Sequence, residues 1–507
     1  MDEGYKTLSA RNLVLFGDTH WHDGDDYSGW HRNSPLTSWS YVGAFRLGSA
    51  ELSTARSVTI IYYTLFLMLF AVAMRKRYSP GTLAGGVAVL SGCAALFFFS
   101  RLALIEAPMI LLLYGWVFAL ARMKEKAYLM PLLSALLVGV ALAQGVKLSA
   151  LVYLIPVIVA MFSSLIFGNG FRTSARVNLF GLVAVVGVGI VLYLERDVWI
   201  KRIDLGPLGY LANVLDNPLI GFAPFLFLIG WVCASHLLLG DFRATVSSPY
   251  RLALVSMVLG GTLLMGVFEY NPPRYYVPLL PAYVLIGCEW LSAKGWRVRW
   301  FPSSRFGAGA AVLLLAVSAF SVAQVANVFL LKTLPLAIGQ EPGLGNSVML
   351  KVFFPLSLCF AGCAWWGRDR WVNGRRIAGV VLVAAVFLPV HSVVRIGSFV
   401  SEPEFDGRST RSLLENAVPE GKSVIGDWAP FFALGTQVRA MYMSDLFNTA
   451  DRLPVLRPDY FLFSDREVSR QSLEVIRGLE GVDLGEPIFE STYNNTQVVL
   501  YPLLYSN

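Results

Sequence analysis

The sequence predicts a polytopic α-helical membrane protein, with about twelve spans and a small α/β domain at the C-terminal end. Two observations predict this fold class. The 507 residues are 55% hydrophobic and only 15% charged, whereas soluble domains have about 45–50% apolar and about 25% charged residues. The apolar residues also form runs long enough to cross a bilayer, about 20 residues each, separated by short charged or Pro/Gly-containing breaks.

The apolar runs define an expected membrane domain over residues 57–399. A single charged residue, Lys147, divides one long apolar stretch into two expected spans. The polar start of the chain, MDEGYKTLSARN, shows no cleavable signal peptide. The predicted spans are 57–74, 82–100, 104–121, 129–146, 148–167, 177–194, 219–239, 252–269, 275–292, 307–330, 349–366 and 377–396.

Basic residues are concentrated in alternate short loops, for example at 75–77, 122–126 and 368–376. By the positive-inside rule these loops are cytoplasmic, and an even number of spans then places residues 1–56 and 400–507 outside. We therefore expect an integral protein of a bacterial inner membrane with both termini extracytoplasmic. The net charge of +7 follows from this topology and does not indicate nucleic-acid binding.

The two external regions differ in character. Residues 1–56 are too polar to span, and Leu36 to Leu52 suggests an amphipathic helix along the membrane interface. Residues 400–507 alternate helical and strand patterns, without a Gly-rich phosphate loop or a nucleophile elbow. All five cysteines lie in or beside apolar runs, so no disulfide framework is expected. The helices expected here are 408–417 and 467–479, and the strands are 422–426, 460–464, 487–491 and 498–501.

Acidic residues at the expected external face are the first functional candidates, since charge near a membrane is costly. Asp2 and Glu3 form an adjacent pair that is either a solvated terminus or a source of a general base or metal ligand. Glu106 precedes Pro108 at a turn between two spans. It either stabilises the start of a helix or binds a substrate hydroxyl, amine or metal.

The basic residues at the same face also allow two interpretations. Lys147 either extends to the interface or places a point charge on a phosphate. Arg101 lies at the same external turn as Glu106. Arg274 and Tyr275 follow a Pro-Pro turn, where they form either an interfacial anchor or a phosphate contact with Tyr275 as hydrogen-bond partner.

A possible divalent-metal site is the pair His20 and His22, with Asp23, Asp25 and Asp26 beside it. The spacing is loose, so metal binding is one alternative and a solvated loop the other. Taken together, the candidate acids and bases all fall at one side of the bundle. Such a cluster favours chemistry on a membrane-borne phosphorylated substrate, whose lipid tail the apolar spans could hold.

The pattern resembles the membrane-embedded glycosyltransferases of the GT-C superfamily, within them the protein O-mannosyltransferase and lipid A aminoarabinose transferase group (glycosyltransferase family 39-like). The order and spacing of several short pieces over roughly residues 1–290 carry the resemblance. These pieces are Asp2-Glu3-Gly4-Tyr5, Ala10-Arg11-Asn12, Ser34-Pro35-Leu36 with Trp39, Ala55-Arg56-Ser57, Ser100-Arg101-Leu102-Ala103 with Glu106, Gly145-Val146-Lys147, and Arg274-Tyr275 with Pro278 and Pro281.

The resemblance implies specific roles for the candidates. The acidic motif of the first external loop falls on Asp2 and Glu3, and the second acidic position falls on Glu106. The external lysine falls on Lys147. A basic residue that contacts donor phosphate in some relatives falls on either Arg32 or His31. Relatives also have a spanning helix before the acidic motif, which begins here at residue 2, so that helix is absent from the expected spans.

Members of this group are similar in moving a sugar from a polyprenyl-phosphate donor to an acceptor lipid, glycan or protein outside the cytoplasm. Because the phosphate is already a good leaving group, one base and positive charge near the phosphate could suffice, with inversion at the anomeric carbon. Other functions remain open, namely a transporter or flippase of lipid-linked glycans and an envelope assembly protein. Substrate sites of transporters tend to lie at the midplane between repeated halves, a pattern that this sequence does not show.

Overall fold

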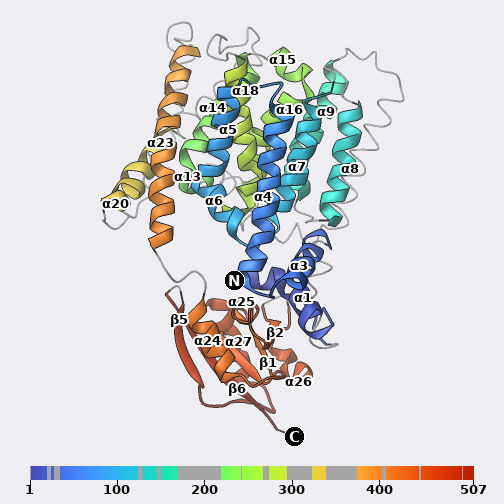
Figure 1. Cartoon of the computed structure of the whole chain (residues 1–507), viewed down its shortest axis with the longest axis vertical. Coiled ribbons are helices and arrows are strands. Elements are labelled where there is room, and N and C mark those ends of the chain that lie inside the picture. Colours follow the sequence, from blue (N-terminus) through green and yellow to red (C-terminus); the bar gives the residue numbers. More distant parts are fainter. Residues whose placement is uncertain are drawn as a thin grey trace.

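The structure is a computed structural model that describes residues 2–19, 24–27, 35–123, 129–145, 150–168, 218–240, 242–266, 273–293, 322–338, 374–401, 407–444, 447–493 and 495–506. It consists of a bundle of apolar helices and a compact α/β domain at one end of that bundle (Figure 1). Two N-terminal helices, α1 (Asp2–Phe16) and α3 (Pro35–Leu47), lie at the junction between these parts. The interfacial helix expected near residues 36–52 corresponds to α3, whereas α1 was not predicted as a helix.

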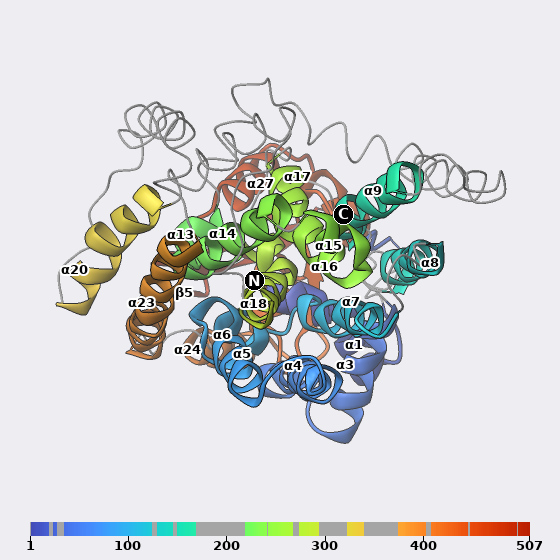
Figure 2. The same cartoon turned by 90° about the horizontal axis from the view of Figure 1, so that it is seen from above.

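The bundle begins with α4 (Leu52–Met74), whose outer face carries exposed apolar side chains such as Ile61, Met68 and Val72. Viewed from above, α18 lies at the centre of the described helices (Figure 2). The other bundle elements are α5 (Pro80–Gly92), α6 (Ala94–Arg101), α7 (Glu106–Leu120), α8 (Leu129–Gly145), α9 (Ala150–Gly168), α13 (Pro218–Phe222), α14 (Pro224–Gly240), α15 (Phe242–Ser247), α16 (Pro249–Val255), the π-helix η1 (Ser256–Gly261), α17 (Thr262–Met265), the 3₁₀-helix η2 (Pro273–Leu279), α18 (Leu280–Ser292), the π-helix η4 (Phe329–Thr333), α20 (Leu334–Ala337) and α23 (Gly374–Ser401).

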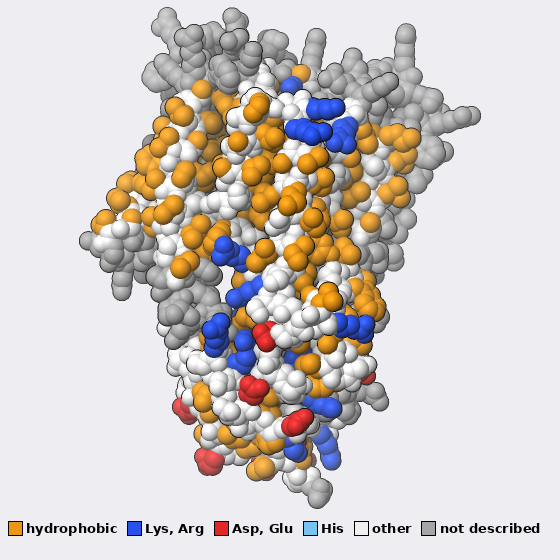
Figure 3. Space-filling view, in the orientation of Figure 1, with side chains coloured by type: hydrophobic (Ala, Val, Ile, Leu, Met, Phe, Trp, Pro, Cys, Tyr) orange, Lys and Arg blue, Asp and Glu red, His pale blue; other side chains and the backbone are white. Residues whose placement is uncertain are grey.

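By length and composition, two described helices can cross a membrane, Leu52–Met74 and Ala378–Ser398, and a bent pair adds a third. Several shorter apolar helices accompany them. The side of the molecule in Figure 3 shows apolar side chains over the bundle, with charged groups gathered toward its two ends. The predicted spans 177–194 and 349–366, and most of 307–330, lie outside the described residues. The chain is thus a helical membrane protein, and the count of twelve spans stays a prediction.

The span predicted over 82–100 is divided at Cys93, where α5 and α6 meet with a bend of 58°. Breaking a helix inside an apolar bundle leaves backbone groups that need partners. Here the Tyr63 hydroxyl donates to the carbonyl of Leu90 over 2.7 Å, and the amide of Ala94 donates to Ser392 Oγ over 3.3 Å. Neighbouring helices α4 and α23 therefore stabilise the break, which points α6 toward the end of the bundle where the α/β domain lies.

The C-terminal domain contains a six-stranded sheet in the order β2-β1-β3-β6-β4, with β5 also paired to β6. Strands β2, β1 and β3 are parallel, whereas β6 runs antiparallel to β3, β4 and β5. The predicted helix 408–417 and strand 460–464 are present with those bounds, but β2 and β4 were not predicted. The elements are α24 (Arg408–Ala417), β1 (Ser423–Gly426), α25 (Ala429–Phe432), β2 (Arg439–Tyr442), η5 (Ala450–Arg452), α26 (Leu453–Leu456), β3 (Tyr460–Ser464), α27 (Glu467–Arg477), β4 (Val482–Leu484), β5 (Phe489–Tyr493) and β6 (Thr496–Tyr505).

One hydrophobic core is shared between the N-terminal helices and the C-terminal domain. It joins Leu8 of α1 and Tyr41 of α3 to Phe431, Phe432 and Leu500 of the C-terminal domain. A second core fills the helix bundle, and a third lies within the C-terminal domain between strands and α27. Because burial of apolar area is the main favourable term in packing, the shared core attaches the C-terminal domain to the N-terminal helices α1 and α3.

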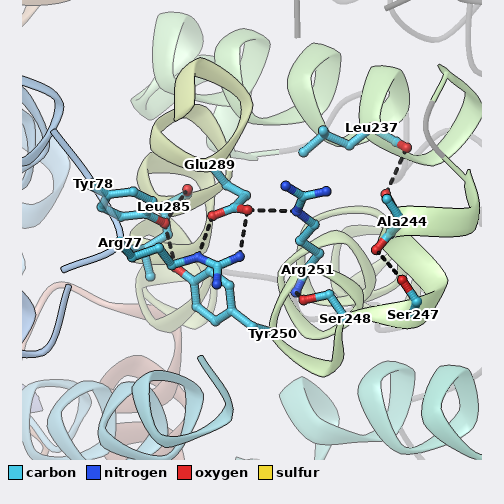
Figure 4. Close-up of polar contacts among 11 residues, drawn as sticks. Arg77, Tyr78, Leu237, Ala244, Ser247, Ser248, Tyr250, Arg251, Leu285 and Glu289 are labelled. Carbon is cyan, nitrogen blue, oxygen red and sulfur yellow. Dashed lines mark hydrogen bonds and ion pairs between the residues drawn. The ribbon is translucent and has the colours of Figure 1, made fainter. Parts of the chain in front are cut away.

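A cluster of charged side chains (Figure 4) joins α16, α18 and the segment after α4 at the end of the bundle away from the C-terminal domain (Figure 1). Glu289, near the end of α18, is 2% exposed and accepts two hydrogen bonds from Arg77, at 2.9 and 2.7 Å. Arg251 of α16 adds a third, from its Nε at 2.7 Å. Arg77 belongs to a basic loop that predicted the topology, and no role was predicted for Glu289. The cluster connects three segments that are far apart in the sequence.

Candidate active site

The end of the bundle beside the C-terminal domain brings two predicted acidic positions together. Glu3 lies in the first turn of α1, and Glu106 is the first residue of α7. Both are almost fully buried, at 6% and 4% exposed. Tyr41 of α3 lies close enough to both that their charges, after burial itself, raise the pKa of its hydroxyl well above the ordinary value. Tyr41 therefore stays a neutral hydrogen-bond donor at physiological pH.

Glu3 is held in place by two groups from the bundle. Arg56 of α4 donates to both carboxylate oxygens, from Nε and Nη2 at 2.8 Å each. The backbone amide of Ala103, in the link between α6 and α7, donates to Oε1 at 2.8 Å. A bidentate Arg–carboxylate pair fixes orientation as well as charge. These bonds hold Glu3 of α1 against α4 and against the link that precedes α7.

Glu106 differs from Glu3 because its Oε2 has no hydrogen-bond partner among the described residues. The hydroxyl of Tyr41, which is 0% exposed, is likewise without a partner in that part of the chain. Buried polar atoms nearly always have a partner, so an exception calls for an explanation such as a bound ligand, ion or water. Among the described residues, these two atoms are unpartnered polar groups at the end of the bundle beside the C-terminal domain.

Helices α7, α9 and η2 pack beside Glu106 at the same end of the bundle. Tyr153 of α9 donates to the backbone carbonyl of Tyr275 at 2.6 Å and lies within electrostatic range of Glu106. Tyr114 of α7 donates to the carbonyl of Pro278 at 2.8 Å and accepts from the amide of Ala282 at 2.9 Å. These bonds fix η2, the short helix that carries the predicted Arg274 and Tyr275.

The predicted basic residues fall into two groups. Arg274 lies in η2 with its guanidinium 5.3 Å from the centre of the Tyr275 ring, so it is attached to the element that Tyr153 holds. Arg101 ends α6, is exposed, and lies 3.6 Å over the Phe97 ring. Lys147, His31 and Arg32 lie outside the described residues.

The predicted metal site cannot be placed from the described residues. His20 and His22 lie outside them, and Asp2 is described only as part of helix α1. Among the residues that the structure describes, no group of three or more His, Cys, Asp or Glu side chains could hold a metal ion. The unpartnered oxygen of Glu106 fits a single metal ligand as well as a hydrogen-bond acceptor.

Three residues of this site were not assigned a role from the sequence. Arg56 was part of the motif Ala55-Arg56-Ser57, and its place just before an expected span was the available signal. Tyr41 and Tyr153 had no such signal, because tyrosines near a membrane are usually interfacial anchors. Only the tertiary arrangement places Tyr41 near both buried carboxylates and Tyr153 near Glu106.

Neither a family model nor a curated protein matches the chain. Among solved structures, the chain is similar to ArnT from Cupriavidus metallidurans bound to undecaprenyl phosphate. The TM-score is 0.52 at 13% sequence identity, with 99% of this chain and 93% of that chain covered. ArnT from the same organism in the apo state gives 0.47 at 12% identity, with the same coverage.

The first of these likenesses extends over nearly the whole chain and shows that its fold is similar to that of ArnT. The resemblance predicted from the motifs is thereby confirmed at the level of fold. The coverage includes the C-terminal half, which the sequence matched only in its general architecture.

Proposed function

We propose that this chain is a glycosyltransferase that moves a sugar from a polyprenyl-phosphate donor to an acceptor on the extracytoplasmic face of the membrane. The observation that carries the proposal is the buried carboxylate of Glu106, whose Oε2 has no described partner and lies near the Tyr41 hydroxyl. The ArnT fold supports it. The solved ArnT holds undecaprenyl phosphate, which makes a polyprenyl phosphate the natural donor carrier to test here.

The proposed reaction needs one base and one region of positive charge. A carboxylate, Glu106 or Asp2, takes the proton of an acceptor hydroxyl while the new bond forms between the acceptor oxygen and the anomeric carbon. The bond from that carbon to the phosphate oxygen breaks, and polyprenyl phosphate leaves with the electron pair. Attack opposite the phosphate inverts the anomeric centre. Arg274, Arg101, the predicted Lys147 and either Arg32 or His31 are the proposed source of positive charge for the departing phosphate.

Glu3 has a different proposed part in this scheme. Arg56 and the Ala103 amide already bind the carboxylate oxygens of Glu3. Glu3 is therefore better suited to fixing the position of the acidic segment, residues Asp2 and Glu3, than to accepting a proton. A divalent metal bound through Glu106 and Asp2 is the alternative use of the same carboxylates, in which it would polarise the acceptor or the phosphate. A chelator separates the two, since only a metal-dependent transferase would lose activity in excess EDTA.

The deciding experiment replaces Glu106 by Gln and measures sugar transfer from an undecaprenyl-phosphate-linked sugar by the purified protein. Loss of a base costs about 10²–10⁴-fold in rate, and we expect a fall of at least 10²-fold. Glu51→Gln is the matched control, because Glu51 is an exposed carboxylate just before α4 at the same end of the bundle. Wild-type turnover by Glu106→Gln would contradict the site. Accumulation of glycan in vesicles without glycosidic product would instead favour a flippase.

A further inference from the structure

The helix that carries the acidic segment is fastened to the C-terminal domain along one face. Gly4, directly after Glu3, lies against the backbone of α25. A Cβ atom at this position would be 2.3 Å from the amide nitrogen of Phe431 and 2.7 Å from the carbonyl carbon of Pro430. Contacts this short are not tolerated, and the atoms concerned belong to the backbone, which cannot rotate away. Only glycine permits this approach between α1 and α25.

A second attachment lies two turns further along α1. Arg11 is 0% exposed and donates through Nη2 to the carbonyls of Thr436 and Val438, at 3.0 and 2.5 Å. Residues seven apart share a helix face and lie about 10 Å apart along the axis. Gly4 and Arg11 therefore fix both the rotation of α1 and its position along its axis relative to the C-terminal domain.

The segment after α1 is attached to the same domain. Asn448, which is fully buried with φ +46°, donates from its side chain to Asp25 Oδ1 at 2.7 Å and from its backbone amide to Asp26 Oδ1, also at 2.7 Å. Its own Oδ1 accepts from the amide of Asp26 at 3.1 Å. Arg452 adds an ion pair with Asp26. The described parts of the first external segment are thus held by the C-terminal domain at both α1 and residues 25–26.

These contacts surround the acidic segment from two sides. The bundle holds Glu3 through Arg56 and Ala103, while the C-terminal domain holds the next residue, Gly4, and then Arg11. We propose that the C-terminal domain positions the acidic segment for the transfer reaction, with Gly4 and Arg11 as the positioning residues. This inference rests on the proposed function. Its physical basis is that a displacement of about 1 Å in a reacting group can reduce the rate about 10²-fold.

The test compares Gly4→Ala with Gly43→Ala, a glycine in α3 whose added Cβ would meet nothing within 4 Å. Gly4→Ala forces α1 away from α25, so we expect kcat per folded protein to fall at least 10-fold. The KM for the undecaprenyl-phosphate-linked sugar is expected to stay within about twofold. Gly43→Ala should keep both values. A merely structural role would reduce the folded fraction and leave kcat per folded protein unchanged, which would overturn the inference.

A second variant covers the case in which Gly4→Ala does not fold. Arg11→Lys keeps the charge but replaces the rigid planar group by an ammonium on a shorter, flexible side chain, and the same fall in kcat without a change in KM is expected. If Glu106→Gln is inactive while Gly4→Ala or Arg11→Lys keeps full kcat, only the positioning inference fails. If the wild-type chain transfers no sugar, the proposed function fails.

Tryptic cleavage after Lys6 then tests the attachment directly, because Gly4→Ala should be cut faster than Gly43→Ala. Equal cleavage rates of the two variants would overturn the inference.

Discussion

Two glutamates at opposite ends of the bundle are buried to nearly the same extent but differ in their partners. Glu289 is 2% exposed and accepts three hydrogen bonds from two arginines, whereas Glu106 is 4% exposed and its Oε2 accepts no hydrogen bond from a described residue. A buried charge is costly unless it is paired. The pairing of Glu289 therefore indicates a structural role, and the missing partner of Glu106 among the described residues supports the proposal that this glutamate binds a ligand. Burial alone does not separate these roles.

The largest expected effect on stability comes from removing the paired glutamate. Glu289→Ala leaves two guanidinium groups without their carboxylate, and breaking a buried pair costs about 3–5 kcal/mol. The Arg77 and Arg251 side chains are 30% and 19% exposed, so partial solvation reduces the loss to about 3 kcal/mol. Thermal unfolding of the detergent-solubilised protein measures it, with Glu51→Ala as control. An unchanged melting temperature would show that the cluster does not hold the three segments together.

Removing one arginine should have a smaller effect than removing the shared carboxylate. After Arg251→Ala, Glu289 still accepts both bonds from Arg77. Loss of one hydrogen bond to a charged group costs about 1.5–3 kcal/mol, and the partial exposure of Arg251 places the expected value near the lower limit. Thermal unfolding of Arg251→Ala beside Glu289→Ala provides the comparison. Equal destabilisation by both variants would mean that Arg77 alone cannot neutralise the carboxylate.

The smallest change in stability is expected at the other glutamate. Glu106→Gln has the same shape and removes a charge for which the described residues supply no partner at Oε2. The free energy of unfolding should therefore change by less than about 1 kcal/mol, while the transferase activity falls. The same melting experiment checks the first part of this expectation. A strong destabilisation by Glu106→Gln would place it with Glu289 and remove the contrast between the two ends.

Much of the fold could be predicted from residue patterns. Runs of about 20 apolar residues have one stable form in a bilayer, which is a helix, and α4 and α23 lie where such runs were found. Alternating patterns located α24, α27 and most of the strands in the C-terminal domain. Strands β2 and β4 were missed because these short segments are defined by their pairing with β1 and β6 and show no pattern of their own. The break at Cys93 was missed because its stability comes from Tyr63 and Ser392 on other helices.

The sequence by itself determined that this is a helical membrane protein. Apolar runs and charged breaks are local properties of the chain, and they decide directly which segments are stable in a bilayer. It also supplied the candidate acids Glu3 and Glu106. Only the tertiary structure decided their pairing, because a partner such as Arg56 or the Ala103 amide comes from distant sequence. The importance of Gly4 also depends on the tertiary structure, because it comes from the close contact of this residue with the backbone of α25. The residue types determine which chemical groups are present, but the chemistry of each group depends on the neighbours that the fold brings into contact with it.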